Sequence, residues 1–213
     1  MLSFIEYTQI MKEMSELITF SASPPHFTDS KNNKTIYDSV KKLENKKLLY
    51  KLTDYANIYI IDNALYCVDD NLQRITYYMW FKIEHDVKLG GEFAYQQVVW
   101  SEQDADLKQK VSYLKGVPIK VIYDFLLSKY KTITNSQQQS HMGRNFWFKI
   151  IETAFVKKLN VYHYNPDKNQ LTKIDNSKEW EQYQKSNTTI WEFGNEINKE
   201  RIVITSKKLE ELK

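Results

Sequence analysis

Hydrophobic side chains recur every three or four positions near the start of the chain, as they do along one face of a helix. This stripe is made of Tyr7, Ile10, Met11, Met14, Leu17 and Ile18. Ser3 and Glu6 precede it at the spacing of a capping box, which satisfies backbone N–H groups where a helix begins. The pattern predicts an amphipathic helix over residues 3–19. Pro24, Pro25 and small polar residues then predict a loop over residues 21–33, followed by a short helix over residues 36–43.

Short hydrophobic runs separated by turn-forming residues begin at residue 47. The runs at 48–52, 57–62 and 64–69 are typical of strands. Residues 75–84 alternate between an apolar face and an amphipathic face and form the strongest strand pattern in the chain. A Gly-Gly pair then predicts a turn, and residues 94–100 form the partner strand. Together these runs predict an antiparallel meander.

The helical period returns in the second half of the chain. Pro118 suits the first turn of a helix that carries Ile122 and Phe125, and a second helix carries Trp147 on its apolar stripe. The strands expected here are residues 132–134, 161–164, 190–193 and 201–205, with the last two as a closing hairpin, and a short helix covers residues 179–184. The chain is therefore expected to be an α+β protein, a mixed and largely antiparallel sheet with helices on its faces.

Length and composition narrow the class of protein. A chain of 213 residues is long enough for one well-buried core, so we expect a single domain over residues 1–213. The 30 basic and 27 acidic residues are spread along the chain, which gives no clear nucleic-acid signal. The single Cys67 and four His residues predict no metal site, and Cys67 is interpreted as a small buried hydrophobe. No apolar run predicts a membrane span or signal peptide, so we expect a cytoplasmic location.

The segment from Thr132 to Tyr164 has the most informative order of elements. A strand ending in Thr134-Asn135-Ser136 leads into a polar loop, a lone Gly143, a helix carrying Trp147 and a strand with the sequence VYHYN. This order resembles the strand, loop, helix and strand half of a set of tailed-phage proteins related to the GNAT superfamily of N-acetyltransferases. The order of the preceding strands is compatible with the same fold.

The resemblance implies an acyl-CoA such as acetyl-CoA as cofactor and transfer of its acyl group to an amine. It implies a diphosphate near Gly116 and Val117, because free N–H groups at a helix start favour anions. It also implies polar ligand contacts from Asn135 and Ser136 at the split in the sheet, and a terminal tyrosine acid, for which Tyr164 or Tyr162 is the candidate. His141 in the polar loop is a candidate acid or base from its residue type alone.

Three departures from the GNAT pattern accompany this resemblance. The stretch Lys108 to Ile119 contains one glycine, Gly116, where the family has Q/R-x-x-G-x-G/A. Asn135 stands where an Asp is sometimes found, and no Glu or His has the expected place of a general base. The alternative interpretations are that Gly116 is an ordinary loop glycine and that His141 is a solvated loop residue.

Three functional hypotheses follow, and the third is a plain structural accessory domain whose likeness to the GNAT fold is accidental. The first is a GNAT-like acyltransferase that uses acyl-CoA. The second is a non-catalytic, phage-encoded interaction protein on the same scaffold, which binds a host protein as an inhibitor of a host system or serves as an internal virion component. A phage-encoded protein of either kind would be found in the host cytoplasm.

Overall fold

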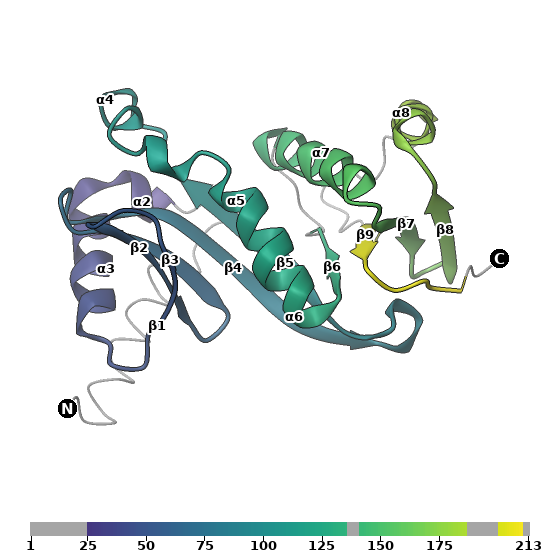
Figure 1. Cartoon of the computed structure of the whole chain (residues 1–213), viewed down its shortest axis with the longest axis horizontal. Helices are drawn as coiled ribbons and strands as arrows, with labels where there is room; N and C mark the ends of the chain where they lie inside the picture. The colour runs from purple at the N-terminus through teal and green to yellow at the C-terminus, as the bar shows by residue number, and fades with distance from the viewer. Residues whose placement is uncertain (1–24, 136–140, 187–199, 211–213) are drawn as a thin grey trace. The chain divides into compact units, whose positions relative to one another are not determined.

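The computed structural model describes residues 25–135, 141–186 and 200–210, and Figure 1 shows the arrangement of their helices and strands. Within these residues the strands form one nine-stranded sheet in the order β1-β2-β3-β4-β5-β6-β9-β7-β8. Most of the pairs are antiparallel, whereas β5 and β6 are parallel, so the sheet is mixed. The expected α+β class is confirmed. The predicted helix over residues 3–19 and the predicted strand at 190–193 lie outside the described residues.

Contacts within the described residues divide the chain into two compact units. The first unit comprises the described part of Met1–Trp80 together with Val98–Val117. The second comprises Phe81–Gln97 and the described part of Pro118–Lys213. The two long strands, β4 (Arg74–Asp86) and β5 (Gly91–Ser101), contribute residues to both units.

The first unit is built on the predicted meander. Strand β1 (Lys47–Lys51) pairs with β2 (Ala56–Ile61), which pairs with β3 (Ala64–Asp69), which pairs with β4, and every pair is antiparallel. Asp62 and Gln73 adopt positive φ angles at the two tight connections, a conformation that turns require. The strands predicted from short apolar runs and from the alternation over residues 75–84 are confirmed in this unit.

A helix begins earlier than expected in the first unit. The predicted loop over residues 21–33 is wrong for its second half, because α2 (Pro25–Thr28) and α3 (Ser30–Lys42) occupy it. The Asp29 carboxylate accepts a hydrogen bond from the Asn32 N–H at 2.8 Å and caps α3. The Asn33 side chain, which had suggested a loop, is buried and bonds to the backbone of other segments.

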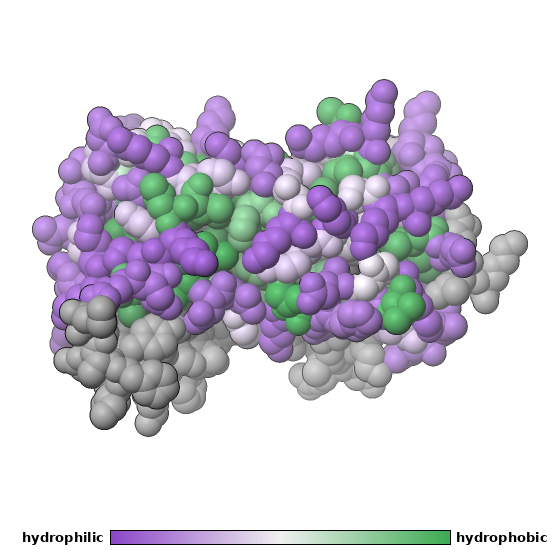
Figure 2. Space-filling model, turned by 60° about the horizontal axis from the view of Figure 1, so that its bottom comes forward, coloured by the Kyte–Doolittle hydropathy of each residue, from purple (hydrophilic) through white to green (hydrophobic). Residues whose placement is uncertain are grey.

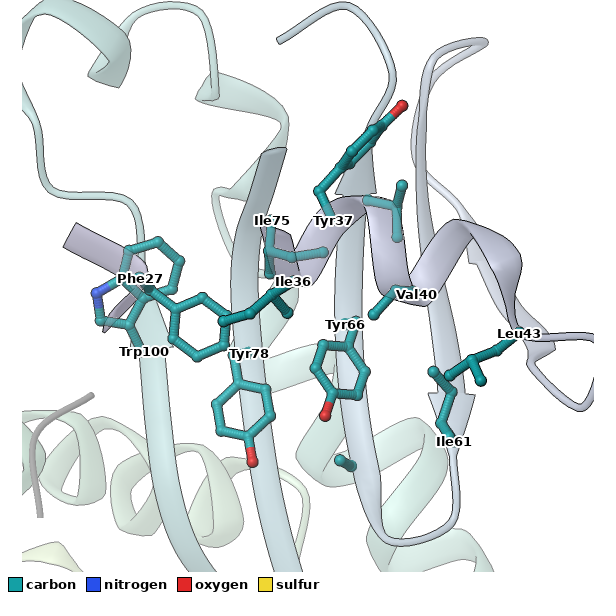
Figure 3. Packing of buried hydrophobic residues seen from close by; sticks show 12 residues of the cluster. Phe27, Ile36, Tyr37, Val40, Leu43, Ile61, Tyr66, Ile75, Tyr78 and Trp100 are labelled. Atoms are coloured by element: carbon teal, nitrogen blue, oxygen red, sulfur yellow. The ribbon is translucent and has the colours of Figure 1, made fainter. Parts of the chain in front are cut away.

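Aromatic residues fill the core between α3 and the meander. Figure 3 shows Ile36 and Val40 of α3 directed toward Tyr66 of β3 and Tyr78 of β4. The Phe27 ring stacks on Trp100, with 4.9 Å between ring centroids. Each such side chain contributes about 1.5–3 kcal/mol by burial, so this cluster stabilises the packing of α3 on the meander. The short helices α4 (Ala105–Lys108) and η2 (Ser112–Leu114) follow β5, and α5 (Val117–Lys120) begins at the unit boundary.

The second unit contains the parallel pair of strands. The hairpin between β4 and β5 turns through η1 (Val87–Leu89), where Gly90 adopts a left-handed conformation with φ of 81°. The π-helix η3 (Val121–Leu127) and α6 (Ser128–Tyr130) lead into β6 (Thr132–Thr134). Helix α7 (His141–Val156) then leads into β7 (Asn160–Asn165) and β8 (Gln170–Ile174), and α8 (Ser177–Ser186) precedes β9 (Arg201–Thr205).

Strand β9 is inserted between two earlier strands. Val203 faces Thr134 of β6 on one side and Tyr162 of β7 on the other, and both pairings are antiparallel. The sequence pattern predicts a closing hairpin for residues 201–205, whereas in the structure they pair with β6 and β7. The pattern does not predict β8, because Gln170–Ile174 has only two buried side chains.

The visible surface of the described residues is mostly hydrophilic. Figure 2 shows hydrophilic side chains over most of the visible face, with small hydrophobic groups between them. Among the described residues no helix combines the length and apolar character needed to cross a membrane. In the same residues no cluster of three or more metal-binding side chains is present. Cys67 is buried as expected, and burial raises the pKa of its thiol to about 12, so the thiol stays protonated at neutral pH.

Candidate functional site

The candidate site is the place where β5 and β6 stop pairing, which we call the β5–β6 fork. The two parallel strands are in register at Ala94 with Ile133 and at Tyr95 with Thr134. Strand β6 ends at Thr134, whereas β5 continues to Ser101. Ligands of open sheets with parallel strands commonly bind beyond the carboxyl ends of such strands. The residues of the fork all belong to the second unit.

Asn135 ties the end of β6 to β9. Its side-chain Oδ1 accepts a hydrogen bond from the Ile202 N–H at 2.6 Å, and its own N–H donates to the Ile202 carbonyl at 3.4 Å. The side chain is fully buried. The amide therefore continues the ladder of backbone hydrogen bonds beyond the last residue of β6, and it holds that end of the fork in place.

Gln96 lies on β5 one residue past the last registered pair. It is buried, and its Oε1 accepts a hydrogen bond from the Trp147 indole N–H at 2.7 Å. Trp147 was expected to be a core residue, and its complete burial confirms this. The sequence did not show that this tryptophan also anchors α7 to the β5 side of the fork.

Arg201 approaches the fork from β9. Its guanidinium lies 4.6 Å from the centroid of the Tyr95 ring and 5.9 Å from that of Phe93, both on β5. Nη1 of Arg201 donates to the Glu84 carboxylate of β4 at 3.1 Å. Because β6 lies between β9 and β5 in the sheet, the arginine side chain reaches over the end of β6.

Tyr164, the predicted general acid, lies on β7 on the same face as Arg201. Its hydroxyl donates to the Asp86 carboxylate at 3.0 Å, and the residue is 4% exposed. Burial and the Asp86 hydrogen bond raise the pKa of Tyr164 to about 12. The hydroxyl therefore carries its proton at neutral pH. Tyr162, the neighbouring candidate, is bound instead to the backbone of Leu209.

The predicted diphosphate residues lie in the other unit. Gly116 has a φ of 79°, and a Cβ placed on it would meet no atom within 4 Å. Val117 is buried and opens α5. Both residues end the first unit, whereas Asn135 and Tyr164 belong to the second. The two other predicted site residues are Ser136, which lies outside the described residues, and His141, which is the first residue of α7 and whose side chain is not among those described.

The structure adds a buried histidine, His163 of β7. His163 is 8% exposed, its Nε2 lies 3.3 Å from Glu200 Oε2, and its ring is 5.2 Å from that of Tyr183. Asn165 donates to the other oxygen of Glu200. Burial lowers the pKa of His163, although the Glu200 carboxylate opposes that shift. The pairing of β7 with β9 brings these side chains together, and local sequence carries no sign of that pairing.

Comparisons of this chain with protein-family models, with curated proteins and with solved structures gave no match.

Proposed function

We propose that this chain is a GNAT-like protein that binds acyl-CoA at the β5–β6 fork and transfers the acyl group to an amine. The observation that carries the proposal is the fork itself. Two parallel strands separate after Tyr95 and Thr134, and buried polar side chains from both strands lie at that point. A split between strands at this polar strand end is the feature that the resemblance over residues 132–164 implies.

The elements of that resemblance support the same proposal. Residues 132–164 form a strand, a helix and a strand in the order expected, namely β6, α7 and β7. Strand β5 continues to Ser101, past its last registered pair with β6, which ends at Thr134. An extended chain with amide groups, such as the pantetheine arm of CoA, can bind to such an edge as an added strand does.

The proposed reaction needs a proton acceptor and a proton donor. The amine nitrogen forms a bond to the thioester carbonyl carbon, the carbon–sulfur bond breaks, and CoA leaves as a thiolate. The amine loses one proton and the thiolate gains one, so the protons balance. We assign the donor role to Tyr164, because its hydroxyl is protonated at neutral pH. His141 remains the candidate acceptor of the amine proton.

A non-catalytic interaction protein is the second candidate function, and two observations favour it. The Oδ1 of Asn135 and the hydroxyl of Tyr164 already have partners within the chain, Ile202 and Asp86. The segment of residues 108–119 contains only Gly116 where an acyl-CoA diphosphate loop has several glycines. In that case the fork would be a remnant of the scaffold, and function would rest on a host protein partner.

Calorimetric titration with acetyl-CoA and with CoA tests the proposal. The expected result is saturable binding to the full chain and a rise in melting temperature that grows with ligand concentration. Gln97→Trp fills the fork just past Tyr95 and is expected to weaken binding at least about ten-fold. Glu92→Trp, an exposed position earlier on β5, serves as the matched control and should bind normally.

The diphosphate prediction is tested separately with Gly116→Leu. A loss of acetyl-CoA affinity in this variant supports a phosphate-binding role for Gly116, and unchanged affinity removes Gly116 from the site while leaving the fork. No binding of acetyl-CoA by the wild-type chain at millimolar concentration contradicts the acyltransferase proposal and favours the interaction protein.

A further inference from the structure

Three buried polar atoms at the β5–β6 fork have no hydrogen-bond partner among the described residues. They are Oγ1 of Thr134, Nε2 of Gln97 and Nε of Arg201. Buried polar groups in proteins are almost always hydrogen-bonded, and an unpaired one costs free energy. Three unpaired atoms on neighbouring strands are therefore more than an isolated packing defect.

Strand register places the three side chains on one face of the sheet. Thr134 is paired with Tyr95 of β5, and Gln97 follows Tyr95 by two residues, so it points to the same face. On the other side Thr134 is paired with Val203 of β9, and Arg201 precedes Val203 by two residues. The face that carries Tyr95 and Val203 is thus also the face of Thr134, Gln97 and Arg201.

The position of the Arg201 guanidinium brings the three groups to the same part of that face. It lies 4.6 Å from the centroid of the Tyr95 ring, although Tyr95 and Arg201 are on strands separated by β6. The arginine therefore extends over the end of β6, where Thr134 is the last residue. Gln97 lies on the stretch of β5 that β6 no longer accompanies.

Thr132 provides an internal comparison on the same strand and the same face. Its hydroxyl lies 2.9 Å from Thr205 Oγ1 and donates to the Leu89 carbonyl, so it is satisfied within the protein. Both threonines are fully buried. Only the threonine at the fork lacks a partner, which is the expected state of a group that serves a ligand.

We propose that Thr134, Gln97 and Arg201 bind a carboxylate group of the molecule that accepts the acyl group. Gln97 and Arg201 offer N–H donors and Thr134 offers a hydroxyl, and a carboxylate accepts several such bonds. Arg201 supplies a positive charge, and Glu84 holds Nη1 so that Nε remains for the ligand. Asp86, the other nearby acid on this face, accepts from Tyr164. The acceptor is therefore an amine that also carries a carboxylate.

The role as acceptor site rests on the proposed function, but carboxylate binding itself does not. The test uses the ¹⁵N-labelled full chain and three probes of similar size: butyrate, its neutral amide butyramide, and butylammonium. Butyrate is expected to shift the Gln97 Nε2 and Arg201 Nε resonances saturably. Butyramide should bind at least about ten-fold more weakly, because it lacks the charge that pairs with the guanidinium, and butylammonium should cause no saturable shift.

Thr134→Val keeps the shape of the side chain and removes the hydroxyl. It is expected to weaken butyrate binding about ten-fold without lowering the melting temperature, since the hydroxyl has no partner in the free protein. Thr153→Val on α7, where the hydroxyl bonds only to its own helix, is the matched control and should bind butyrate as the wild type does.

Equal affinity for butyrate and butyramide would overturn the proposal, as would unchanged butyrate binding by Thr134→Val or the absence of any binding. The acetyl-CoA titration distinguishes the acyltransferase proposal from the carboxylate-site proposal. Butyrate binding without acetyl-CoA binding would leave a carboxylate site and remove the acyltransferase, whereas the reverse result would remove only the carboxylate site.

Discussion

Asn33 in the first unit and Thr134 in the second are both fully buried polar residues, yet their surroundings differ completely. The Asn33 amide donates to the Phe27 and Ile75 carbonyls, each at 2.9 Å, and its Oδ1 accepts from the Ile75 N–H at 2.7 Å. Within the described residues the Thr134 hydroxyl has no hydrogen-bond partner. The Asn33 side chain connects α2, α3 and β4. The Thr134 side chain lies at the end of β6.

This difference distinguishes buried polar groups that stabilise the fold from buried polar groups that are available to bind a ligand. A buried amide with all its bonds made stabilises the fold, because its loss would leave several backbone groups unsatisfied. A buried hydroxyl without a hydrogen bond slightly destabilises the fold. A buried polar residue whose hydrogen bonds are all made is explained by the fold alone. A buried polar residue without a hydrogen bond suggests a ligand.

Replacing Asn33 should have the largest effect on stability. In Asn33→Leu the Phe27 and Ile75 backbone groups lose their partners inside the core, and we expect the free energy of unfolding to fall by about 3 kcal/mol. Urea denaturation of the purified chain measures this. Asn32→Leu, at the preceding and more exposed position in α3, is the control and should change stability by less than about 1 kcal/mol. Equal losses in the two variants would contradict the role given to Asn33.

The two threonines of β6 should respond differently to the same substitution. Thr132→Val breaks a bond to Thr205 and leaves the Leu89 carbonyl with one partner fewer, so a loss of about 1 kcal/mol is expected. Thr134→Val removes only an unpaired hydroxyl, and the free energy of unfolding should stay the same or rise. Thermal unfolding of the two variants side by side provides the measurement. A larger loss for Thr134→Val would show that its hydroxyl is bonded within the free protein.

The smallest expected effect is the contribution of His163 to the pH dependence of the free energy of unfolding. Burial lowers the pKa of His163 below its ordinary value of 6.5, so below that pH the unfolded chain binds a proton that the folded chain does not. The stability that His163 contributes is therefore present above about pH 6.5 and is lost as the pH falls toward its lowered pKa. Urea denaturation between about pH 7.5 and about pH 5.5 should show a steeper loss for the wild type than for His163→Gln. His85→Gln, at an exposed position on β4, should keep the wild-type slope, and identical slopes for all three proteins would contradict the prediction.

Much of the fold could be predicted because its signals are local. Short apolar runs between turn residues predicted β1 to β3, alternating side chains predicted β4, and the helical stripe around Trp147 predicted α7. The start of α3 was missed because Asn33 looks like a loop residue until its partners on β4 are known. The insertion of β9 between β6 and β7 depends on pairing between distant segments, which no local pattern encodes.

The candidate site was predictable only in part for the same reason. The polar strand end at Asn135 was visible in the sequence, and the structure places it at the fork. Gln97 and Arg201 were not singled out, since glutamine in a strand and arginine at a strand start are ordinary residues. Their importance comes from the register of β5, β6 and β9, which brings them to one face with Thr134.

The insertion of β9 also sets an order of events during synthesis of the chain. Strands β6 and β7 are synthesised before Arg201–Thr205, so the edges that pair with β9 lack that partner until then. At 5–20 residues per second, the interval between completing Asn165 and Thr205 lasts about 2 to 8 s. The sheet of the second unit is therefore completed only after its last described strand has been synthesised.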